Sequence, residues 1–390
     1  MDAAVIVEAV RTPVGRRGGA LRAIHPADLA ATVLREAVDR AGIDPARIDD
    51  VILGCVDQVG EQSVNVARWA ALGAGLPETV PATTVDRQCG SAQQAVHFAA
   101  QGVMAGAYDI VVAGGVESMT RVPMWSNFTD RAQPYGDRAR ERLALPGDAF
   151  IDQGISGEIV AERYEITRDE LDAFALESHL RAARAIDEGR FDAEVLPVAT
   201  GLDGDGPDVL RHDEGVRRDT SLQSLAGLRP VFRPDGRLTA GTSSQISDGA
   251  AALVITSERV ALDLGLRPRA RFAGFGLAGV DPVEMLTGPI PATRTALARA
   301  GLTLDDIDLF EVNEAFASVP IAWMRALGVE ADRVNVNGGA IALGHPLGCT
   351  GARLMTTLLH EMERRGVRYG LQAMCEGGGM ANATILELCM

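Results

Sequence analysis

Hydrophobic and polar residues are arranged along the chain in blocks that predict strands and helices in turn. The apolar runs at residues 3–10 and 48–56 predict strands. Over residues 26–42, apolar side chains recur at helical spacing between an initial proline and a final glycine, which predicts a helix. Strands that alternate with helices in this way favour an α/β fold with a mostly parallel sheet covered by helices on its faces.

Cys89 lies at the junction of two further elements. The β-branched run at residues 80–85 predicts a strand, and the Ala- and Gln-rich run after Ser91 predicts a helix. The unpaired N–H groups and positive dipole at a helix N-terminus favour a thiolate over a thiol. We therefore expect a lowered pKa and a nucleophilic role for Cys89. An inert buried cysteine is the alternative, because free cysteine is among the most buried residue types.

Two segments of the chain recur later in the same order. Residues 35–51 match residues 294–310 without a gap, and residues 90–119 run parallel to residues 351–380. Two matches in the same order indicate that the chain contains one α/β unit twice.

Residues 119–247 have no counterpart in this repeat. They are irregular and polar, with one capped amphipathic helix and a charged loop. Long insertions of this kind are often functional, so we interpret this one as a lid or substrate domain, with a solvated surface excursion as the alternative. The sequence thus predicts a first core half at residues 1–118, the insertion at 119–247 and a second core half at 248–390.

Composition narrows the classes of function. The chain has 390 residues and 47% hydrophobic content, enough for two or three domains with real cores. A net charge of −16 argues against nucleic acid or an anionic membrane as a partner. All 37 basic residues are arginine, which excludes Schiff-base lysine chemistry and a Walker-type phosphate lysine.

The cysteines argue against both a disulfide framework and a metal site. They number five and are scattered over a long chain, so disulfides are not expected. None of the Cys or His pairs has the spacing of a zinc site, and we predict no metal. Because no apolar run approaches the roughly 18 residues of a membrane span and no signal peptide is recognisable, we expect a cytoplasmic protein.

Four short runs carry residues suited to chemistry. They are DRQCGSAQQA with Cys89, NEAFA with Asn313, GHPLG with His345 and CEGGGM with Cys375. In the repeat, Cys89 corresponds to a position beside His345, and Cys375 corresponds to Gly114, so equivalent sheet edges should meet. Two thiols, an imidazole and glycine-rich turns at one edge are the parts of an acyl-transfer site. Taken singly, each run has a structural alternative, because such a His or Cys often belongs to the core.

Together, these runs resemble those of the thiolases over essentially the full chain. The active-cysteine run, the inserted loop domain, NEAFA, GHPLG and the final CEGGG follow one another in the family's order. The resemblance implies a duplicated βαβαβαββ core in α/β/α/β/α layers, with the loop domain inserted between its halves. It also implies a homodimer or a homotetramer.

The resemblance implies a role for each matching residue. Cys89 would attack the acyl carbonyl and hold the acyl group as a thioester, with His345 as the base that activates it. Asn313 would position a water in a first oxyanion hole. Cys375 would exchange a proton with the α-carbon of acetyl-CoA. The backbone N–H groups of Cys89 and Gly377 would form a second oxyanion hole, where a glycine lets the backbone approach the substrate.

Coenzyme A is the expected co-substrate, and no tightly bound cofactor is expected. The positions that match the family's CoA-binding residues are Arg217, Ser224 and Ser244. An arginine suits the phosphate and adenine end of CoA. Arg218 is adjacent, so the match can slip by one residue, and solvated surface residues are the alternative.

The implied reaction is CoA-dependent cleavage of a 3-oxoacyl-CoA to acetyl-CoA and a shortened acyl-CoA through a Cys89 acyl-enzyme. Residues 152–154 are Asp-Gln-Gly, where short-chain biosynthetic thiolases typically carry His-Met-Gly, so we expect the degradative, β-oxidation type. The alternatives are an acetyl-CoA C-acetyltransferase, which forms acetoacetyl-CoA, and a non-catalytic acyl-CoA or lipid carrier. Glu376 replaces a commonly apolar residue, and we expect its charge to raise the pKa of Cys375.

Overall fold

The computed structural model describes residues 2–128, 134–146, 149–202 and 206–389. Its strands, including two in a separate small sheet, are β1 (Ala4–Arg11), β2 (Gly15–Arg16), β3 (Asp50–Gly54), β4 (Ala82–Val85), β5 (Ile110–Ser118), β6 (Val198–Ala199), β7 (Val209–Leu210), β8 (Ser247–Ser257), β9 (Ala270–Gly279), β10 (Leu309–Val312), β11 (Tyr369–Glu376) and β12 (Met380–Leu388). Its α-helices are α1 (Pro26–Ala41), α2 (Val66–Gly73), α3 (Ser91–Met104), α4 (Asp137–Arg142), α5 (Gln153–Arg163), α6 (Arg168–Asp187), α7 (Leu222–Ala226), α8 (Glu258–Asp263), α9 (Pro289–Ala300), α10 (Ser318–Leu327), α11 (Ala340–Leu343) and α12 (Thr350–Arg365).

The main sheet repeats one strand pattern. Its order is β10-β11-β12-β9-β1-β8-β5-β3-β4, with β2 beside β8. Read outward from the centre, β1-β8-β5-β3 in one half corresponds to β9-β12-β11-β10 in the other. The halves join where β1 pairs with β9. This arrangement agrees with the duplication that the sequence predicts.

The expectation of a mostly parallel sheet is wrong. The parallel pairs are β3 with β4, β3 with β5, and β10 with β11. The central strands β1, β8, β9 and β12 pair antiparallel. The physical reason is the chain reversal between β11 and β12, where Gly378 and Gly379 adopt positive φ angles of 80° and 76° in a tight turn that no helical crossover replaces.

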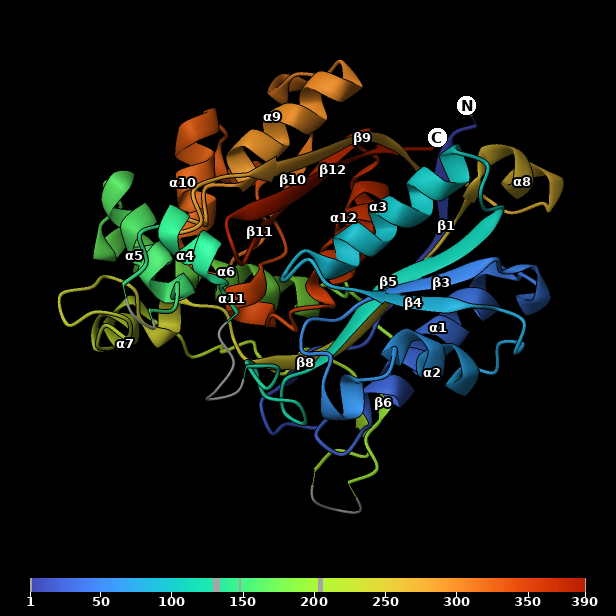
Figure 1. Cartoon of the computed structure of the whole chain (residues 1–390), viewed down its shortest axis with the longest axis horizontal. Helices are drawn as coiled ribbons and strands as arrows, with labels where there is room; N and C mark the ends of the chain where they lie inside the picture. The colour runs from blue at the N-terminus through green and yellow to red at the C-terminus, as the bar shows by residue number, and fades with distance from the viewer. Residues whose placement is uncertain (1, 129–133, 147–148, 203–205, 390) are drawn as a thin grey trace.

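Helices form three layers around the two halves of the sheet (Figure 1). Helices α1 and α2 pack on the outer face of the first half, and α9 and α10 on the outer face of the second half. Helices α3 and α12 contact each other and share a core between the halves. This layering places the N-termini of the two buried helices side by side, close to the ends of β5 and β11.

The predicted helix ends are confirmed by their caps. Helix α1 ends at Ala41, and Gly42 follows with a φ of 66°. Helix α9, its counterpart in the repeat, ends at Ala300, and Gly301 follows with a φ of 67°. A left-handed residue is needed at both places to close the helix, and glycine adopts that conformation without strain.

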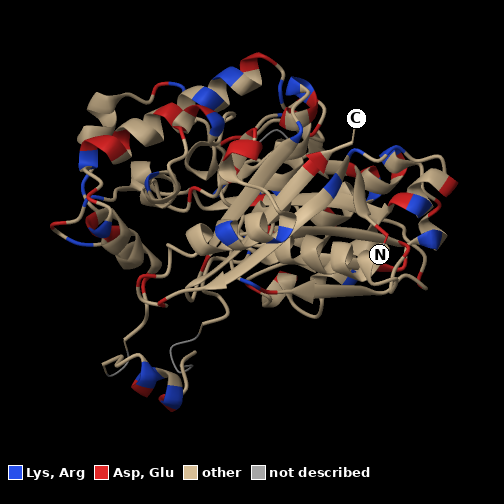
Figure 2. Ribbon diagram, turned by 90° about the horizontal axis from the view of Figure 1, so that it is seen from above, with Lys and Arg blue, Asp and Glu red and all other residues tan. Residues whose placement is uncertain are grey.

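The segment between β5 and β8 contains α4 to α7 and the small β6–β7 pair (Figure 1). Helix α6 begins with a capping box at Thr167, as the amphipathic pattern predicts. Charged residues gather on peripheral helices and loops, and the sheet is largely free of them (Figure 2). The expected division at 118/119 and 247/248 stays a prediction; β8, which follows it, pairs with β1 and β5 of the first half.

Candidate active site

Cys89 stands immediately before the buried helix α3. Gln88 turns the chain with a positive φ of 50°, and Gly90 is the N-cap residue without a side-chain cap. The Cys89 side chain is 4% exposed and packs against Leu354 and Met374. The predicted position of this thiol at a helix start is therefore confirmed.

The expected lowering of the Cys89 pKa is wrong. Burial raises the pKa of this thiol, and the nearby Cys375 and Glu376 raise it further. The Gln153 amide acts in the opposite direction, but the desolvation of a charged thiolate outweighs it. Position at a helix end is visible in the sequence, whereas burial depends on the packing of distant segments. Cys89 is therefore a neutral thiol at rest.

His345 is a buried, neutral imidazole with one ring nitrogen free to accept a proton. Burial lowers its pKa to about 3, and the charge of Arg353 contributes. Its Nδ1 lies 2.6 Å from the Thr350 hydroxyl, which donates its own proton to the carbonyl oxygen of Pro346 at 2.8 Å. The Thr350 oxygen therefore accepts from Nδ1–H, and we assign the free lone pair to Nε2.

Asn313 links His345 to the second thiol. Its Nδ2 lies 3.5 Å from Nε2 of His345 and 4.0 Å from Sγ of Cys375. Its Oδ1 is buried and has no hydrogen-bond partner in the described chain, which leaves an acceptor available in the site. The structure thus brings His345, Asn313 and Cys375 together, and Cys375 is close enough to Cys89 to shift its pKa.

Cys375 is fully buried in β11. Burial raises the pKa of its thiol to about 12, the Asn313 side chain opposes this shift, and Glu376 adds to it. The expected effect of Glu376 on Cys375 is therefore confirmed in direction, although burial is the larger cause. Both thiols of the site carry their protons at neutral pH.

Gly377 begins the turn after β11 and faces the segment before α3. A Cβ atom at Gly377 would lie 2.9 Å from Oε1 of Gln88, closer than side chains normally approach. Because Gln88 precedes Cys89, the backbones of Gly377 and Cys89 face one cavity. A side chain at Gly377 would narrow it.

An apolar cavity of about 490 Å³ opens over Cys89. Four aromatic side chains line it, and Phe150 contacts the other three at ring-centroid distances of 5.1 to 5.9 Å. These residues are Trp125, Phe128, Tyr135 and Phe150. Gln153 lines the same cavity, so the residue that the sequence singles out beside the acyl group does lie there. Such a lining suits an apolar or ring-bearing group.

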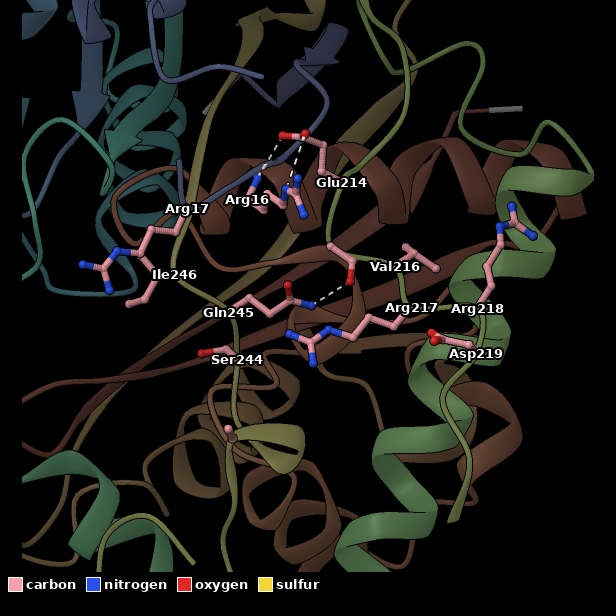
Figure 3. Close-up of a pocket in the computed structure, with 12 residues that line it drawn as sticks. Arg16, Arg17, Glu214, Val216, Arg217, Arg218, Asp219, Ser244, Gln245 and Ile246 are labelled. Carbon is pink, nitrogen blue, oxygen red and sulfur yellow. Dashed lines mark hydrogen bonds and ion pairs between the residues drawn. The ribbon is translucent and has the colours of Figure 1, made fainter. Parts of the chain in front are cut away.

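A second cavity, of about 650 Å³, is lined by arginines (Figure 3). Arg217 and Ser244 line it, as do Arg16 and Arg17, which the sequence did not single out. Arg16 lies near Glu214, whereas no ion pair occupies Arg17 or Arg217 within the described ranges. Two uncompensated guanidinium groups in an acidic protein suit an anionic ligand.

Arg217 and its neighbour Arg218 have different surroundings. In Figure 3 Arg217 extends toward Gln245 and Ser244, while Arg218 points away. Arg218 forms an exposed ion pair with Asp187 at 2.7 Å. Ser224 lies on α7, bonded to Ser221, and is not part of the cavity lining. The structure therefore brings two of the three predicted CoA-binding residues together.

Short connections link the arginine cavity to the reactive groups. The backbone N–H of His345 donates to the carbonyl oxygen of Gln245 at 3.2 Å, and Gln245 lines that cavity. The N–H of Ser244 donates to the carbonyl oxygen of Ala315, two residues after Asn313, at 2.9 Å. One wall thus leads from the arginines to His345 and Asn313.

Sequence reasoning missed Thr350, Arg16 and Arg17. Thr350 aligns with Cys89 in the internal repeat, which marks its position but not its contact with His345. The adjacent arginines follow β1 in an otherwise acidic chain, and that local basic pair was the available signal.

Neither a metal cluster nor a membrane-spanning helix occurs in the part of the chain that the structure describes. No three or more His, Cys, Asp or Glu side chains there are arranged to hold a metal ion. None of the helices there combines the length and the apolar character needed to cross a membrane.

Comparison with known proteins identifies the family. Residues 4–259 match the family model described as thiolase, N-terminal domain, and residues 266–388 match thiolase, C-terminal domain. The chain is 52% identical to a steroid 3-ketoacyl-CoA thiolase of Mycobacterium tuberculosis, over 99% of this chain and 94% of that one. It is 47% identical to a 3-ketoacyl-CoA thiolase of Bacillus subtilis, over the full length of both.

A solved structure agrees with this result. The crystal structure of the Bacillus anthracis acetyl-CoA acetyltransferase superposes with a TM-score of 0.91 at 43% identity, and covers 100% of this chain and 99% of that chain. Both core halves, the inserted segment and the cluster of two thiols, imidazole and amide are thus part of a known architecture. The chain belongs to the thiolase family of acyltransferases.

Proposed function

We propose that the chain is a degradative thiolase, which uses CoA to cleave a 3-oxoacyl-CoA into acetyl-CoA and a shortened acyl-CoA. The observation that carries this proposal is the meeting of two neutral thiols with a neutral imidazole, beside one apolar and one arginine-lined cavity. Breaking a C–C bond next to a thioester needs a nucleophile for one fragment and an acid for the other. Two separate thiols satisfy both needs.

Cys89 is the proposed nucleophile. Because burial keeps it protonated at rest, it loses its proton as it attacks the 3-keto carbon, and Nε2 of His345 is the proposed acceptor. The C2–C3 bond then breaks, the shortened acyl group stays on Cys89 as a thioester, and the enolate of acetyl-CoA leaves. Cys375 donates its proton to C2 of that enolate. CoA thiol finally attacks the thioester and releases the shortened acyl-CoA.

Oxyanions that form during this reaction need hydrogen-bond donors. We assign one oxyanion site to His345 and to a water held by Asn313, whose buried Oδ1 is available to accept from that water. We assign the other to the backbone N–H groups of Cys89 and Gly377, which face the apolar cavity. Loss of one preorganised donor of this kind typically costs about 10²- to 10³-fold in rate.

CoA is proposed to enter through the arginine cavity. Arg217 and Arg17 would hold its phosphates, and the wall formed by Ser244 and Gln245 leads the thiol end toward His345. Ser224 stays a proposed contact on α7, at the rim of this region. No other cofactor is required by the reaction.

The proposed acyl group is bulky. The cavity over Cys89 is wide and lined by four aromatic side chains, and one relative is named for a steroid substrate. Flat aromatic walls favour a ring-bearing or long apolar chain over an acetyl group.

The test is thiolysis of a panel of 3-ketoacyl-CoA substrates, from acetoacetyl-CoA to long-chain and ring-bearing members, followed by loss of the 3-keto chromophore. We expect turnover of the bulky members that disappears in Cys89→Ala. Turnover of acetoacetyl-CoA alone would replace this proposal with the acetyl-CoA C-acetyltransferase, the activity named for the Bacillus anthracis structure. No Cys89-dependent turnover at all would favour an acyl-CoA or lipid carrier.

A homo-oligomer and a cytoplasmic location belong to the same proposal. Strand β4 is at one edge of the sheet, beside the exposed side chains of Val64 and Trp69, which suits a second copy of the chain. Light scattering would separate a dimer or tetramer from a monomer. All five cysteines are free, which fits a reducing compartment.

A further inference from the structure

Glu376 is a buried carboxyl group next to both reactive thiols. It is the last residue of β11, directly after Cys375, and its side chain is 0% exposed. Neither of its oxygens has a hydrogen-bond partner in the described structure. A native protein rarely leaves two carboxyl oxygens buried and unpaired, so this group requires an explanation.

The carboxyl group lies against the residue that follows Cys89. A Cβ atom added to Gly90 would fall 2.0 Å from Oε1 of Glu376 and 2.9 Å from Nδ2 of Asn382. Asn382, on β12, donates to the carbonyl oxygen of Gly90 at 3.1 Å, and its own Oδ1 is buried without a partner. Glu376 thus reaches from the Cys375 side of the site to the backbone that carries Cys89.

A charged carboxylate is unfavourable in these surroundings. An ionised group that leaves water without donors loses most of its solvation, and it takes up a proton instead. Burial accordingly raises the pKa of Glu376 to about 8, although the charge of Arg87 opposes the shift. At neutral pH the neutral acid is the major form.

Ionisation of Glu376 would act on both thiols. Its negative charge raises the pKa of Cys89 and of Cys375, because each thiolate would then face a like charge. The other charged groups around it are Arg87 and Asp86, from the segment between β4 and α3, and they act in opposite directions. From β12 it faces the neutral Asn382.

We propose that Glu376 is a positioning residue that stays protonated while the two thiols work, and that its ionisation in alkaline solution suppresses thiolate formation at Cys89 and Cys375. This inference rests on the proposed function, in which those thiols react. It assigns the buried carboxyl group a task that an apolar residue at this position would not perform: it limits the activity of the site at high pH.

The test compares the rate of alkylation of Cys89 by iodoacetamide in the wild type and in Glu376→Gln between pH 6 and pH 10, measured by mass spectrometry of the Cys89 peptide. Below pH 7 both proteins carry a neutral side chain, and we expect equal rates. Above pH 9 only the wild type gains a charge beside the thiol, and we expect the variant to react about tenfold faster, as one pKa unit of like-charge interaction requires.

Two further variants complete the experiment. Glu376→Leu removes the charge without a polar group, and it should follow the glutamine variant above pH 9. The matched control is Glu311→Gln, because burial raises the pKa of Glu311 to about 8 as well, but Glu311 faces Arg353. This control should follow the wild type at every pH.

The proposal is overturned if the profiles of wild type and both Glu376 variants superimpose over the whole range. It is also overturned if the variants react faster at pH 6, since Glu376 would then already be charged. Alkylation needs no substrate turnover, so these outcomes are independent of the thiolysis test of the proposed function.

Discussion

The two halves of the core have the same strand order and different chemistry. In the first half, the residue before the buried helix α3 region is the thiol Cys89, and the matching residue at the start of α12 is Thr350. In β11 the second half carries Cys375, and the matching residue of β5 is Gly114. Each pair of equivalent positions therefore supplies one thiol and one residue that serves it or makes space.

This difference shows how a duplicated fold forms a single site. A Cβ atom at Gly114 would lie 2.0 Å from the carbonyl oxygen of Ala251, so the strands of the first half leave no space for a thiol there. A Cβ atom at Gly115 would lie 2.1 Å from the carbonyl oxygen of Gly348 in the loop before α12. The first half is thus closely packed against the second, which carries His345, Asn313 and Cys375.

The largest effect on this comparison is expected from the second thiol. Cys375→Ala removes the proposed acid for the enolate, and thiolysis should fall about 10²- to 10⁴-fold, the usual contribution of a general acid or base. Alkylation of Cys89 by iodoacetamide should persist in the same variant. A loss of less than tenfold would mean that Cys375 does not supply the proton.

A substitution in the matching strand should affect stability. Gly114→Ala places a methyl group against the backbone of Ala251, so we expect a loss of about 1–3 kcal/mol or more in the free energy of unfolding. Denaturant unfolding measures it. Gly279→Ala is the control, because a Cβ atom there meets no atom within 4 Å. Equal stability of the two variants would contradict the close packing of the first half.

The hydroxyl that matches Cys89 is expected to orient the base. Thr350→Val removes the acceptor for Nδ1–H of His345, and kcat should fall about tenfold, the value of one hydrogen bond. Thr350→Ser keeps the hydroxyl and should restore kcat. If serine and valine behave alike, Thr350 acts only through packing.

The smallest effect should come from outside the repeated halves. Arg217→Ala should raise the KM for CoA about tenfold with little change in kcat, because it removes one charge-assisted contact. Arg218→Ala should change neither, since that arginine is paired with Asp187 at the surface. A stronger effect of Arg218 would shift the proposed phosphate contact by one residue.

Local signals in the sequence were sufficient for much of the fold. The glycines at 42 and 301 mark helix ends through their own conformation, and the repeated segments reveal the duplication. The direction of the central strands was wrong, because strand pairing is decided by contacts between distant segments. Cys89, His345 and Cys375 were found because each lies in a short run of recognisable order.

The electrostatics of the site could not be predicted in the same way. The helix start near Cys89 is a local feature and suggests a lowered pKa, but burial by α12 and β11 reverses the shift. The tautomer of His345 depends on the Thr350 hydroxyl, and the role of Arg17 depends on a loop that meets the inserted segment. Each of these facts requires the tertiary structure.

The most direct test of the account is the location of the acyl group. The enzyme is mixed with a bulky 3-ketoacyl-CoA in the absence of free CoA, quenched in acid and analysed by peptide mass spectrometry. We predict the mass of the shortened acyl group on the peptide that contains Cys89, and its release as acyl-CoA when CoA is added. An acyl group on Cys375, or the same adduct in Cys89→Ala, would contradict the proposed division of labour between the two thiols.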